Sequence, residues 1–469
     1  MFGPNARTCE ANLIFVVGQQ AAPKADNKKY GTNVDNVLDP LDQAMFEFGR
    51  ATGVNVVVQA VWLYDRAIDI DGLRQFHKSL QRGRLSRRIE RSPLRFGRHR
   101  WVSANGSSDL EIVASARPRE EFDAWLNEQA NILLDPERGP VWHLAALPFT
   151  DGGAGVSLVI PHCVTDGLGL FEGLADAARG RDDPIAWPAG RSRRRWQAMR
   201  EDARQTARDA RAIGHGIASA VRLARRSRGS PGPARPLPAP PPVGADEPIA
   251  IPLATVFVGA DEWEQRAHAL GGSSTALLAG LTAHLARQRG RVTVDGLVAL
   301  RIPFNQRTAG DTRGNAVSNV DVMVDPACVT TDLRGIRATI KQALVDHREL
   351  PDEERAMLSL IPVLPKRLLK LAGNPTGVVS TSLGAVPPAA TRPDGTDADY
   401  LAMRMHYPGV TTAMMHRFGG VQIVGSGTAN RHVFVTVLGY QPGQHNSNDG
   451  LRHDLSSALK DFSLTGTFL

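Results

Sequence analysis

The chain has 469 residues, of which 42% are hydrophobic and 22% are charged, and its formal net charge is +7. This length exceeds a single ordinary hydrophobic core, so we expect two domains of about 150 to 220 residues each. The three cysteines are far apart in the sequence, which excludes a disulfide scaffold or a cysteine zinc site and favours a reducing, cytoplasmic compartment. No apolar run reaches the roughly 18 residues that a membrane-spanning helix needs.

The first 190 residues divide into a tail and an α/β block. Residues 1–35 are polar without a sustained hydrophobic pattern, so we expect a loose N-terminal tail. Residues 36–190 are predicted to form a first lobe. Its apolar runs predict a helix and three strands, near Ile70–Leu80, Val54–Leu63, Leu144–Pro148 and Val156–Ile160.

The most informative segment of this block surrounds His162. Its apolar residues predict a buried strand that delivers His162 to its C-terminal end, followed by a tight turn and a helix that begins near Gly167. The predicted apolar face of this helix consists of Leu170, Phe171, Leu174 and Ala177. An imidazole fixed at a strand end is well placed to act as a general base, because its unperturbed pKa lies close to neutral pH. A structural histidine held by a backbone carbonyl is the alternative.

Two residues close to His162 suggest further roles. Asp166 suits the N-cap of the following helix, since an aspartate accepts hydrogen bonds from the first free amides. Cys163 could suggest a Cys–His nucleophile, but neighbours in a strand point to opposite faces, so we do not expect a productive pair. A metal site is not predicted either, because His162 and Asp166 have no third ligand cluster nearby.

Residues 191–245 form a connecting segment of unusual composition. Residues 191–228 contain twelve arginines and three acidic residues, so the local net charge (12 − 3 = +9) exceeds the net charge of +7 of the whole chain. Its apolar residues form one helical stripe, namely Trp196, Met199, Ala203, Ala207, Ala210, Ile213, Ile217, Val221 and Ala224. The helix could lie on the protein's own surface with a solvated basic face, or contact an anionic membrane or the phosphates of a ligand. Nucleic-acid binding is not expected, because the arginines are not interleaved with stacking aromatic residues.

A proline-dense stretch, Gly229–Val243, follows and is predicted to be an extended crossover between domains. Residues 246–469 then form a second α/β lobe. Its patterns predict helices near Ser273–Arg289, Leu333–Leu344 and Gly450–Phe462, and strands near Val294–Pro303, Gly377–Ser382, Gly420–Val424 and Val433–Leu438.

Several short motifs occur in a recognisable order along the chain. They are Pro40–Phe46, Trp101–Val102, Pro140–Trp142, His162–Gly167, Ile302–Arg307, Gly314–Asn315 and Val379–Val386. This order resembles the wax ester synthase/diacylglycerol acyltransferase branch of the CoA-dependent acyltransferase superfamily, which also includes chloramphenicol acetyltransferase and condensation domains. His162–Gly167 matches the His-x-x-x-Asp-Gly signature. Each motif is weak alone, but the ordered set is more specific. The chain departs from the pattern at Pro161, where most members of this branch carry a first histidine.

The resemblance implies an α/β fold of two chloramphenicol-acetyltransferase-like lobes. Each lobe would be a mixed sheet flanked by helices, with the active site in the channel between them. His162 would be the general base. Asp166 would pair with an arginine that shapes the histidine loop, and Arg307 fits the family's arginine position better than Arg301. Gly167 would supply room in the turn.

The resemblance also suggests where an oxyanion would be stabilised. Ser380, Thr381 and Ser382 are similar to a Ser-Thr-Ser of carnitine acyltransferases, and Ser382 is the predicted hydroxyl donor. Such donors typically contribute about 3 kcal/mol to lowering the barrier. Idle hydroxyls on an edge strand are the alternative. Asn315 could be a turn residue or a donor that lines the channel.

The resemblance implies transfer of an acyl group, expected to be long-chain, from acyl-CoA to the hydroxyl of an alcohol, a diacylglycerol or another lipid. Acyl-CoA would be a substrate, and neither a cofactor nor a metal would be needed because a thioester is already activated. A carrier-dependent or condensation-type acyltransferase of natural-product or glycolipid synthesis is a second hypothesis. A non-catalytic lipid-binding protein is a third. The protein would be cytoplasmic, with peripheral membrane contact through the arginine-rich helix.

Overall fold

The computed structural model describes residues 36–104, 108–182, 185–229, 246–308, 310–349, 358–360 and 377–469. Within these ranges the side chains at 220, 223–229 and 349 are not described. The expected tail at 1–35 and residues 230–245 of the expected proline-rich crossover lie outside the described residues.

The first lobe is built on a five-stranded mixed sheet with the order β11-β1-β6-β5-β4. Its central strands, β1 (Val57–Tyr64) and β6 (Ala154–Pro161), pair antiparallel and are buried along their whole length. β5 (His143–Pro148) and the short β4 (Glu111–Ile112) extend one side of the sheet, and β11 (Tyr400–His406) closes the other. A separate ribbon is formed by β2 (Arg87–Glu90) and β3 (Arg100–Ser103). Because β1 and β6 are buried along their whole length, both of their faces carry mainly apolar side chains.

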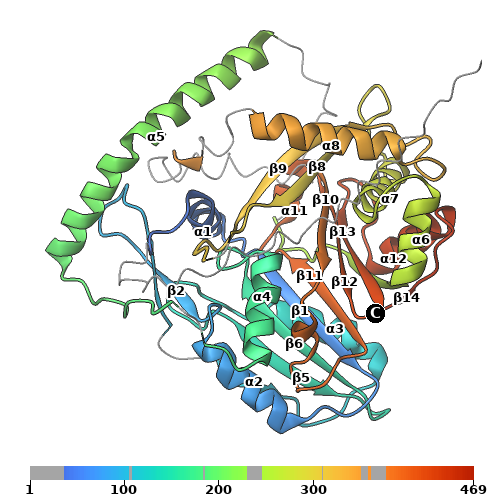
Figure 1. Ribbon diagram of the computed structural model, residues 1–469, viewed down its shortest axis with the longest axis horizontal. Helices are drawn as coiled ribbons and strands as arrows, with labels where there is room; N and C mark the ends of the chain where they lie inside the picture. Colours follow the sequence, from blue (N-terminus) through green and yellow to red (C-terminus); the bar gives the residue numbers. More distant parts are fainter. Residues whose placement is uncertain are drawn as a thin grey trace, which may run out of the picture. The chain divides into compact units, whose positions relative to one another are not determined.

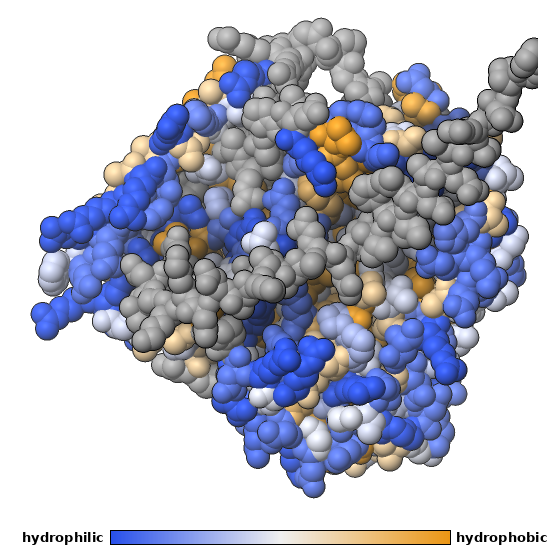
Figure 2. Space-filling view, in the orientation of Figure 1, coloured by the Kyte–Doolittle hydropathy of each residue, from blue (hydrophilic) through white to orange (hydrophobic). Residues whose placement is uncertain are grey.

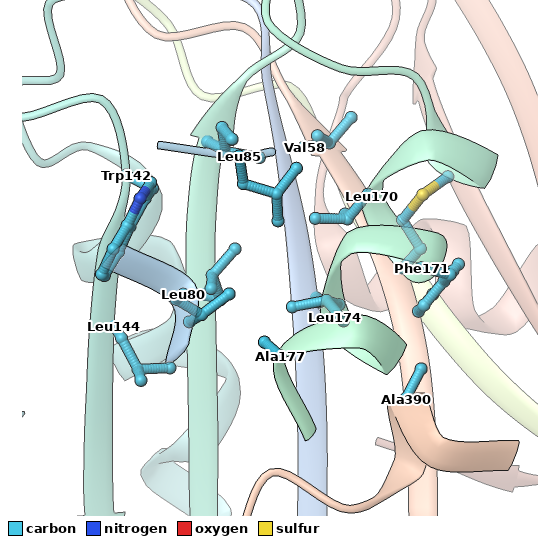
Figure 3. Close-up of a cluster of buried hydrophobic side chains, with 14 of the residues drawn as sticks. Val58, Leu80, Leu85, Trp142, Leu144, Leu170, Phe171, Leu174, Ala177 and Ala390 are labelled. Atoms are coloured by element: carbon cyan, nitrogen blue, oxygen red, sulfur yellow. The ribbon is translucent and has the colours of Figure 1, made fainter. Parts of the chain in front are cut away.

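Helices cover this sheet (Figure 1). They are α2 (Ile70–Arg82), α3 (Phe122–Ala130), which follows the 3₁₀ turn η1 (Arg119–Glu121), and α4 (Gly167–Ala178). α1 (Pro40–Thr52) lies instead at the end of the sheet, next to the residues just before β1. Figure 3 shows the predicted apolar face of α4, from Leu170 to Ala177, turned into a core that also contains Leu80, Trp142 and Leu144. The helical period of three and four residues therefore places these side chains on the sheet as predicted.

The second lobe contains a seven-stranded mixed sheet with the order β14-β7-β13-β12-β10-β8-β9. The strands are β7 (Leu253–Gly259), β8 (Val298–Asn305), β9 (Val317–Val324), β10 (Val378–Ala385), β12 (Val421–Ala429), β13 (His432–Tyr440) and β14 (Thr467–Phe468). β10 lies parallel to both neighbours, whereas β12, β13 and β7 pair antiparallel. Sequence patterns predicted four of these strands, β8, β10, β12 and β13.

The remaining elements pack around this second sheet and beside it. They are α6 (Ala260–Ala269), α7 (Ser274–Gln288), α8 (Arg334–Glu349), α11 (Thr412–Phe418) and α12 (Asn448–Asp461). The 3₁₀ turn η3 (Pro388–Thr391) instead packs in the first lobe. α7 is buried on nearly all sides and begins at the N-cap Ser273, whose hydroxyl accepts from the amide of Ala276. The bounds of this helix agree with the range Ser273–Arg289 that the sequence pattern predicted.

The division of the chain into lobes is less simple than one boundary at residue 246. β11 belongs to the second half of the sequence, yet it pairs with β1 from Val57↔His406 to Leu63↔Tyr400. η3 lies against α4, and the indole Nε1 of Trp62 in β1 donates to the carbonyl of Ala390 at 2.8 Å. Residues 388–406 are therefore part of the first lobe in space.

The arginine-rich segment forms one helix, α5 (Arg195–Gly229), at the left of Figure 1. Within the described residues, no helix combines the length and the apolar character needed to cross a bilayer.

Candidate active site

His162 directly follows β6, in a turn that the neighbouring strand holds in place. Its backbone amide donates to the carbonyl of Val56, just before β1, at 2.8 Å. The amide of Val164 donates to the carbonyl of Pro161 at 2.9 Å, which closes the turn. The strand, the turn and the following helix occur where the sequence predicted them, so the histidine is presented at the end of the first sheet.

Asp166 fills both roles that sequence reasoning proposed for it. Its Oδ1 accepts from the amide of Gly169 at 2.7 Å and so caps α4. Its Oδ2 accepts from Nη2 of Arg307 at 2.7 Å and from the amide of Ala316 at 2.8 Å. Both partners of the ion pair are almost fully buried. Arg301, the other candidate, instead pairs with Asp321. Asp166 therefore joins the histidine turn to the second lobe through Arg307 and Ala316.

The Gly314–Asn315 segment binds the same turn from the second lobe. The amide of Asp166 donates to the carbonyl of Gly314 at 3.0 Å, and Nδ2 of Asn315 donates to the carbonyl of His162 at 2.9 Å. A Cβ on Gly314 would lie 2.8 Å from the carbonyl oxygen of Val164, so only glycine allows this approach. Asn315 is buried, and its hydrogen bonds make it a positioning residue for His162, a role that neither prediction for it included.

Asp42 belongs to the candidate site, although sequence reasoning did not assign it. This buried carboxylate on α1 accepts from the amides of Gly314 and Asn315, both at 2.7 Å, and from Nδ2 of Asn315 at 3.0 Å. Burial raises the pKa of Asp42 to about 7, against the lowering effect of these hydrogen bonds and of Arg87. The signal was present in the Pro40–Phe46 motif, but only the fold brings α1 beside Asn315.

Arg87 is a second unassigned residue of the site. Its Nη2 donates to the carbonyl of Val164 at 3.0 Å and its Nη1 to the carbonyl of Thr312 at 2.6 Å. The guanidinium also lies over the ring of Trp101, 3.9 Å from its centroid. Nothing in the local sequence distinguishes this arginine from the chain's many others.

Gly167 is packed closely against two side chains from the second half of the sequence, Leu383 and Met403. A Cβ at this position would lie 2.7 Å from Cδ2 of Leu383 and 3.0 Å from the sulfur of Met403. A larger residue at position 167 would therefore clash with side chains of β10 and β11, in agreement with the prediction that Gly167 supplies room in the turn.

The imidazole of His162 is half-buried, and burial lowers its pKa below the ordinary value of 6.5. The charge of Asp166 and the side chain of Asn315 act in the opposite direction. Within the described residues, Nδ1 of His162 and Oδ1 of Asn315 are both buried without a hydrogen-bond partner. A lowered pKa keeps the imidazole neutral near pH 7, the form that can accept a proton.

Ser380, Thr381 and Ser382 lie on β10. The next residue of the strand is Leu383, whose side chain approaches Gly167. Ser380 is buried, whereas Thr381 and Ser382 are half-buried. The ladder between β10 and β12 is irregular between Ser382 and Ala385, and the hydroxyl of Ser382 accepts from the amide of Gly384 at 3.4 Å. Among the described residues, no hydrogen bond joins these hydroxyls to His162. Their predicted role at an oxyanion remains a prediction.

An apolar cavity of about 590 Å³ lies at the end of the first sheet, next to the histidine turn, and His162 itself is not among its lining residues. Cys163 lines it, together with residues just before β1 and just after β11, such as Val56 and Tyr407. Further walls come from α1 and α11, including Phe46 and Phe418. Burial raises the pKa of the Cys163 thiol, so the sulfur stays protonated and serves as an apolar wall. No group of three potential metal-ligating side chains occurs in the described part of the chain.

Comparison with known proteins gives likeness in structure alone. The chain matches no protein-family model and no curated protein sequence. The first condensation domain of the calcium-dependent antibiotic synthetase, in complex with a substrate analogue, superposes with a TM-score of 0.58 and 15% identity, covering 92% of this chain and 96% of that one. The wax ester synthase/diacylglycerol acyltransferase from Marinobacter aquaeolei VT8 gives 0.52 and 14%, covering 91% and 98%. A condensation domain from the monacolin K polyketide synthase gives 0.51 and 12%, covering 91% and 96%. The chain therefore has the two-lobed α/β fold of condensation domains and of this wax ester synthase.

Proposed function

We propose that the protein is an acyltransferase in which His162 is the general base. The observation that carries this proposal is the way both lobes hold the histidine turn. Asn315 and Gly314 bind it from the second lobe, and Val56 binds it from the first. A half-buried, neutral imidazole at the meeting point of two lobes can face two reactants at once, as acyl transfer requires.

The proposed reaction proceeds without a covalent enzyme intermediate. A hydroxyl of the acceptor loses its proton to the imidazole while its oxygen attacks the thioester carbonyl. The tetrahedral oxyanion then collapses, the carbon–sulfur bond breaks, and the imidazolium returns the proton to the thiolate. Ser382 is the proposed hydrogen-bond donor to the oxyanion, since it lies in the irregular part of β10 that leads to Gly167.

The proposed donor is a long-chain acyl-CoA, and the proposed acceptor is an alcohol, a diacylglycerol or another lipid hydroxyl. The apolar cavity beside Cys163 supports the choice of a long-chain substrate. Its volume of about 590 Å³ falls within the range of roughly 300 to 1,000 Å³ that is typical of ligand pockets. Each methylene buried there would contribute about 0.8 kcal/mol.

The test combines the purified chain with palmitoyl-CoA and either hexadecanol or dipalmitoylglycerol. Thiol release is followed with a thiol reagent, and the ester is identified by mass spectrometry. We expect ester formation, and a loss of several orders of magnitude in His162→Ala, because removal of a general base typically costs about 10²- to 10⁴-fold. Circular dichroism of the variant controls for folding. Full turnover by His162→Ala would overturn the proposed base.

The same assay separates the alternatives. Transfer only from an acyl group carried on a phosphopantetheinyl carrier protein would replace acyl-CoA as the donor and point to condensation-type chemistry. Saturable binding of palmitoyl-CoA without product under any donor–acceptor pair would point to a lipid-binding protein.

A further inference from the structure

Among the described residues of the apolar stripe of α5, Ile213 is half-buried and the others are exposed, so most of the stripe does not face the protein. Trp196, Met199, Ile217 and Val221 are exposed by 62%, 44%, 53% and 44% of their surfaces, respectively. The alanines of the stripe at 203, 207 and 210 are exposed as well. In a helix that packs on its own protein by hydrophobic contact, this stripe would be the buried one.

The helix instead docks on the first lobe through its acidic and small residues. Asp202 is almost fully buried and accepts from Nη1 of Arg193 at 3.0 Å, Nε of Arg100 at 3.2 Å and the hydroxyl of Ser92 at 2.6 Å. Two turns further on, Asp209 pairs with Arg98 at 3.4 Å. Asp202 and Asp209 thus form inward ion pairs, and the third acidic residue of the helix, Glu201, pairs with Arg193 at 3.3 Å while 36% of its side chain stays exposed.

The outward surface consequently carries mostly positive charge. Arg200, Arg204 and Arg211 are exposed, and a helical rotation of 100° per residue places them in one row beside the apolar stripe. Hydrophilic side chains along this helix, with paler and apolar ones among them, form the left edge of the space-filling view (Figure 2). An exposed tryptophan and aliphatic residues flanked by arginines are typical of helices that lie in a membrane interface.

We infer that the outer face of α5 binds the surface of an anionic phospholipid bilayer. The arginine row would contact lipid phosphates while Trp196, Met199, Ile217 and Val221 enter the headgroup boundary. Two features favour lipid over a second protein chain. The apolar residues form a narrow stripe with many alanines, and Arg200, Arg204 and Arg211 beside it outnumber Glu201, the most exposed acidic residue of this helix, which pairs with Arg193. The inference does not depend on the reaction catalysed at His162.

The experiment is flotation of the full chain with vesicles of phosphatidylcholine alone or of phosphatidylcholine mixed with phosphatidylglycerol. We expect binding to the anionic vesicles only, weakened by added salt. Arg200→Gln/Arg204→Gln/Arg211→Gln should weaken binding at least tenfold, since each arginine near an anionic surface contributes several-fold to affinity. Trp196→Ala/Ile217→Ser should also weaken it at least tenfold, because each large apolar side chain loses its burial.

The matched control removes three exposed arginines elsewhere, as Arg74→Gln/Arg334→Gln/Arg392→Gln. It changes the net charge by the same amount and should bind nearly as well as the unmodified chain. Equal losses in both arginine triples, or no binding to anionic vesicles at all, would overturn the lipid assignment. So would a change in sedimentation mass caused by Trp196→Ala/Ile217→Ser, because that outcome assigns the stripe to a second copy of the chain. All these substitutions are at exposed positions, and circular dichroism checks that each variant is folded.

Discussion

At the scale of single residues, the site depends on a few buried polar groups that hydrogen-bond to one another. The carbonyl of His162 is held by Asn315, Asn315 is held by Asp42, and Asp42 also accepts the amide of Gly314. Each hydrogen bond fixes the next group, so the imidazole is positioned by a chain of contacts that begins on α1. Buried networks of this kind are costly to break because an unmatched polar group loses about 1–3 kcal/mol.

The pH dependence of turnover follows from the lowered pKa of His162. The neutral imidazole is the active form, so turnover falls as the pH drops through that pKa. Because burial lowers the pKa below 6.5, the acidic limb of the profile should have its midpoint below pH 6.5. The measurement is initial rate against pH at saturating substrate.

Asp42 is the competing group in this profile, because its pKa is raised to about 7. The profile should therefore be repeated with Asp42→Asn. An acidic limb that persists in the variant belongs to His162, whereas its disappearance would assign the limb to Asp42.

The cavity beside Cys163 makes a prediction about chain length. Ala44→Phe on α1 would fill part of the cavity and should shift the preferred acyl chain toward shorter lengths. Each excluded methylene loses about 0.8 kcal/mol, or roughly a fourfold decrease in kcat/KM. Competition among acyl-CoAs of different lengths measures the shift. Turnover of butyryl-CoA should stay unchanged, and an unaltered length profile would show that the chain lies elsewhere.

At the scale of elements, α4 and the turn before it are stabilised by one carboxylate with two tasks. Asp166→Asn keeps an oxygen that can accept from the amide of Gly169, but it removes the negative charge opposite Arg307. The side chains of Arg307 and Asp166 are only 6% and 5% exposed, respectively. We expect a loss of about 3–5 kcal/mol in the free energy of unfolding, because the buried arginine loses its partner. Urea denaturation provides the measurement.

Asp166→Ala serves as the comparison, since it removes the cap as well. It should cost about 1 kcal/mol more than Asp166→Asn. Unchanged stability in Asp166→Asn would mean that the ion pair contributes little and that the cap alone orders the turn.

At the scale of the whole molecule, β11 makes the two lobes interdependent. It brings seven residues of the second half into the first sheet, and the first core also includes Phe257 and Phe434 of the second sheet. We therefore expect both lobes to unfold in one calorimetric transition, with the van't Hoff enthalpy close to the calorimetric one. Two resolved transitions would indicate that β11 can leave the first sheet while the second lobe remains folded.

Short-range order was largely determined by the sequence alone. The strand before His162, the cap at Asp166 and the apolar face of α4 follow from local pattern and propensity, and the structure contains all three. The ion pair between Asp166 and Arg307, which the family resemblance implied, is also present. Such features depend on a few neighbouring residues or on a motif, so the linear chain carries them.

Long-range contacts were decided only by the tertiary structure. The sequence could not show that Asp42 anchors Asn315, that β11 joins the first sheet, or that the apolar stripe of α5 faces outward. In each case the decisive partner lies far away along the chain. For α5, three buried contacts to Asp202 outweigh the usual preference for burying the apolar face. Periodicity shows that a helix has two faces, but the neighbours decide which face is covered.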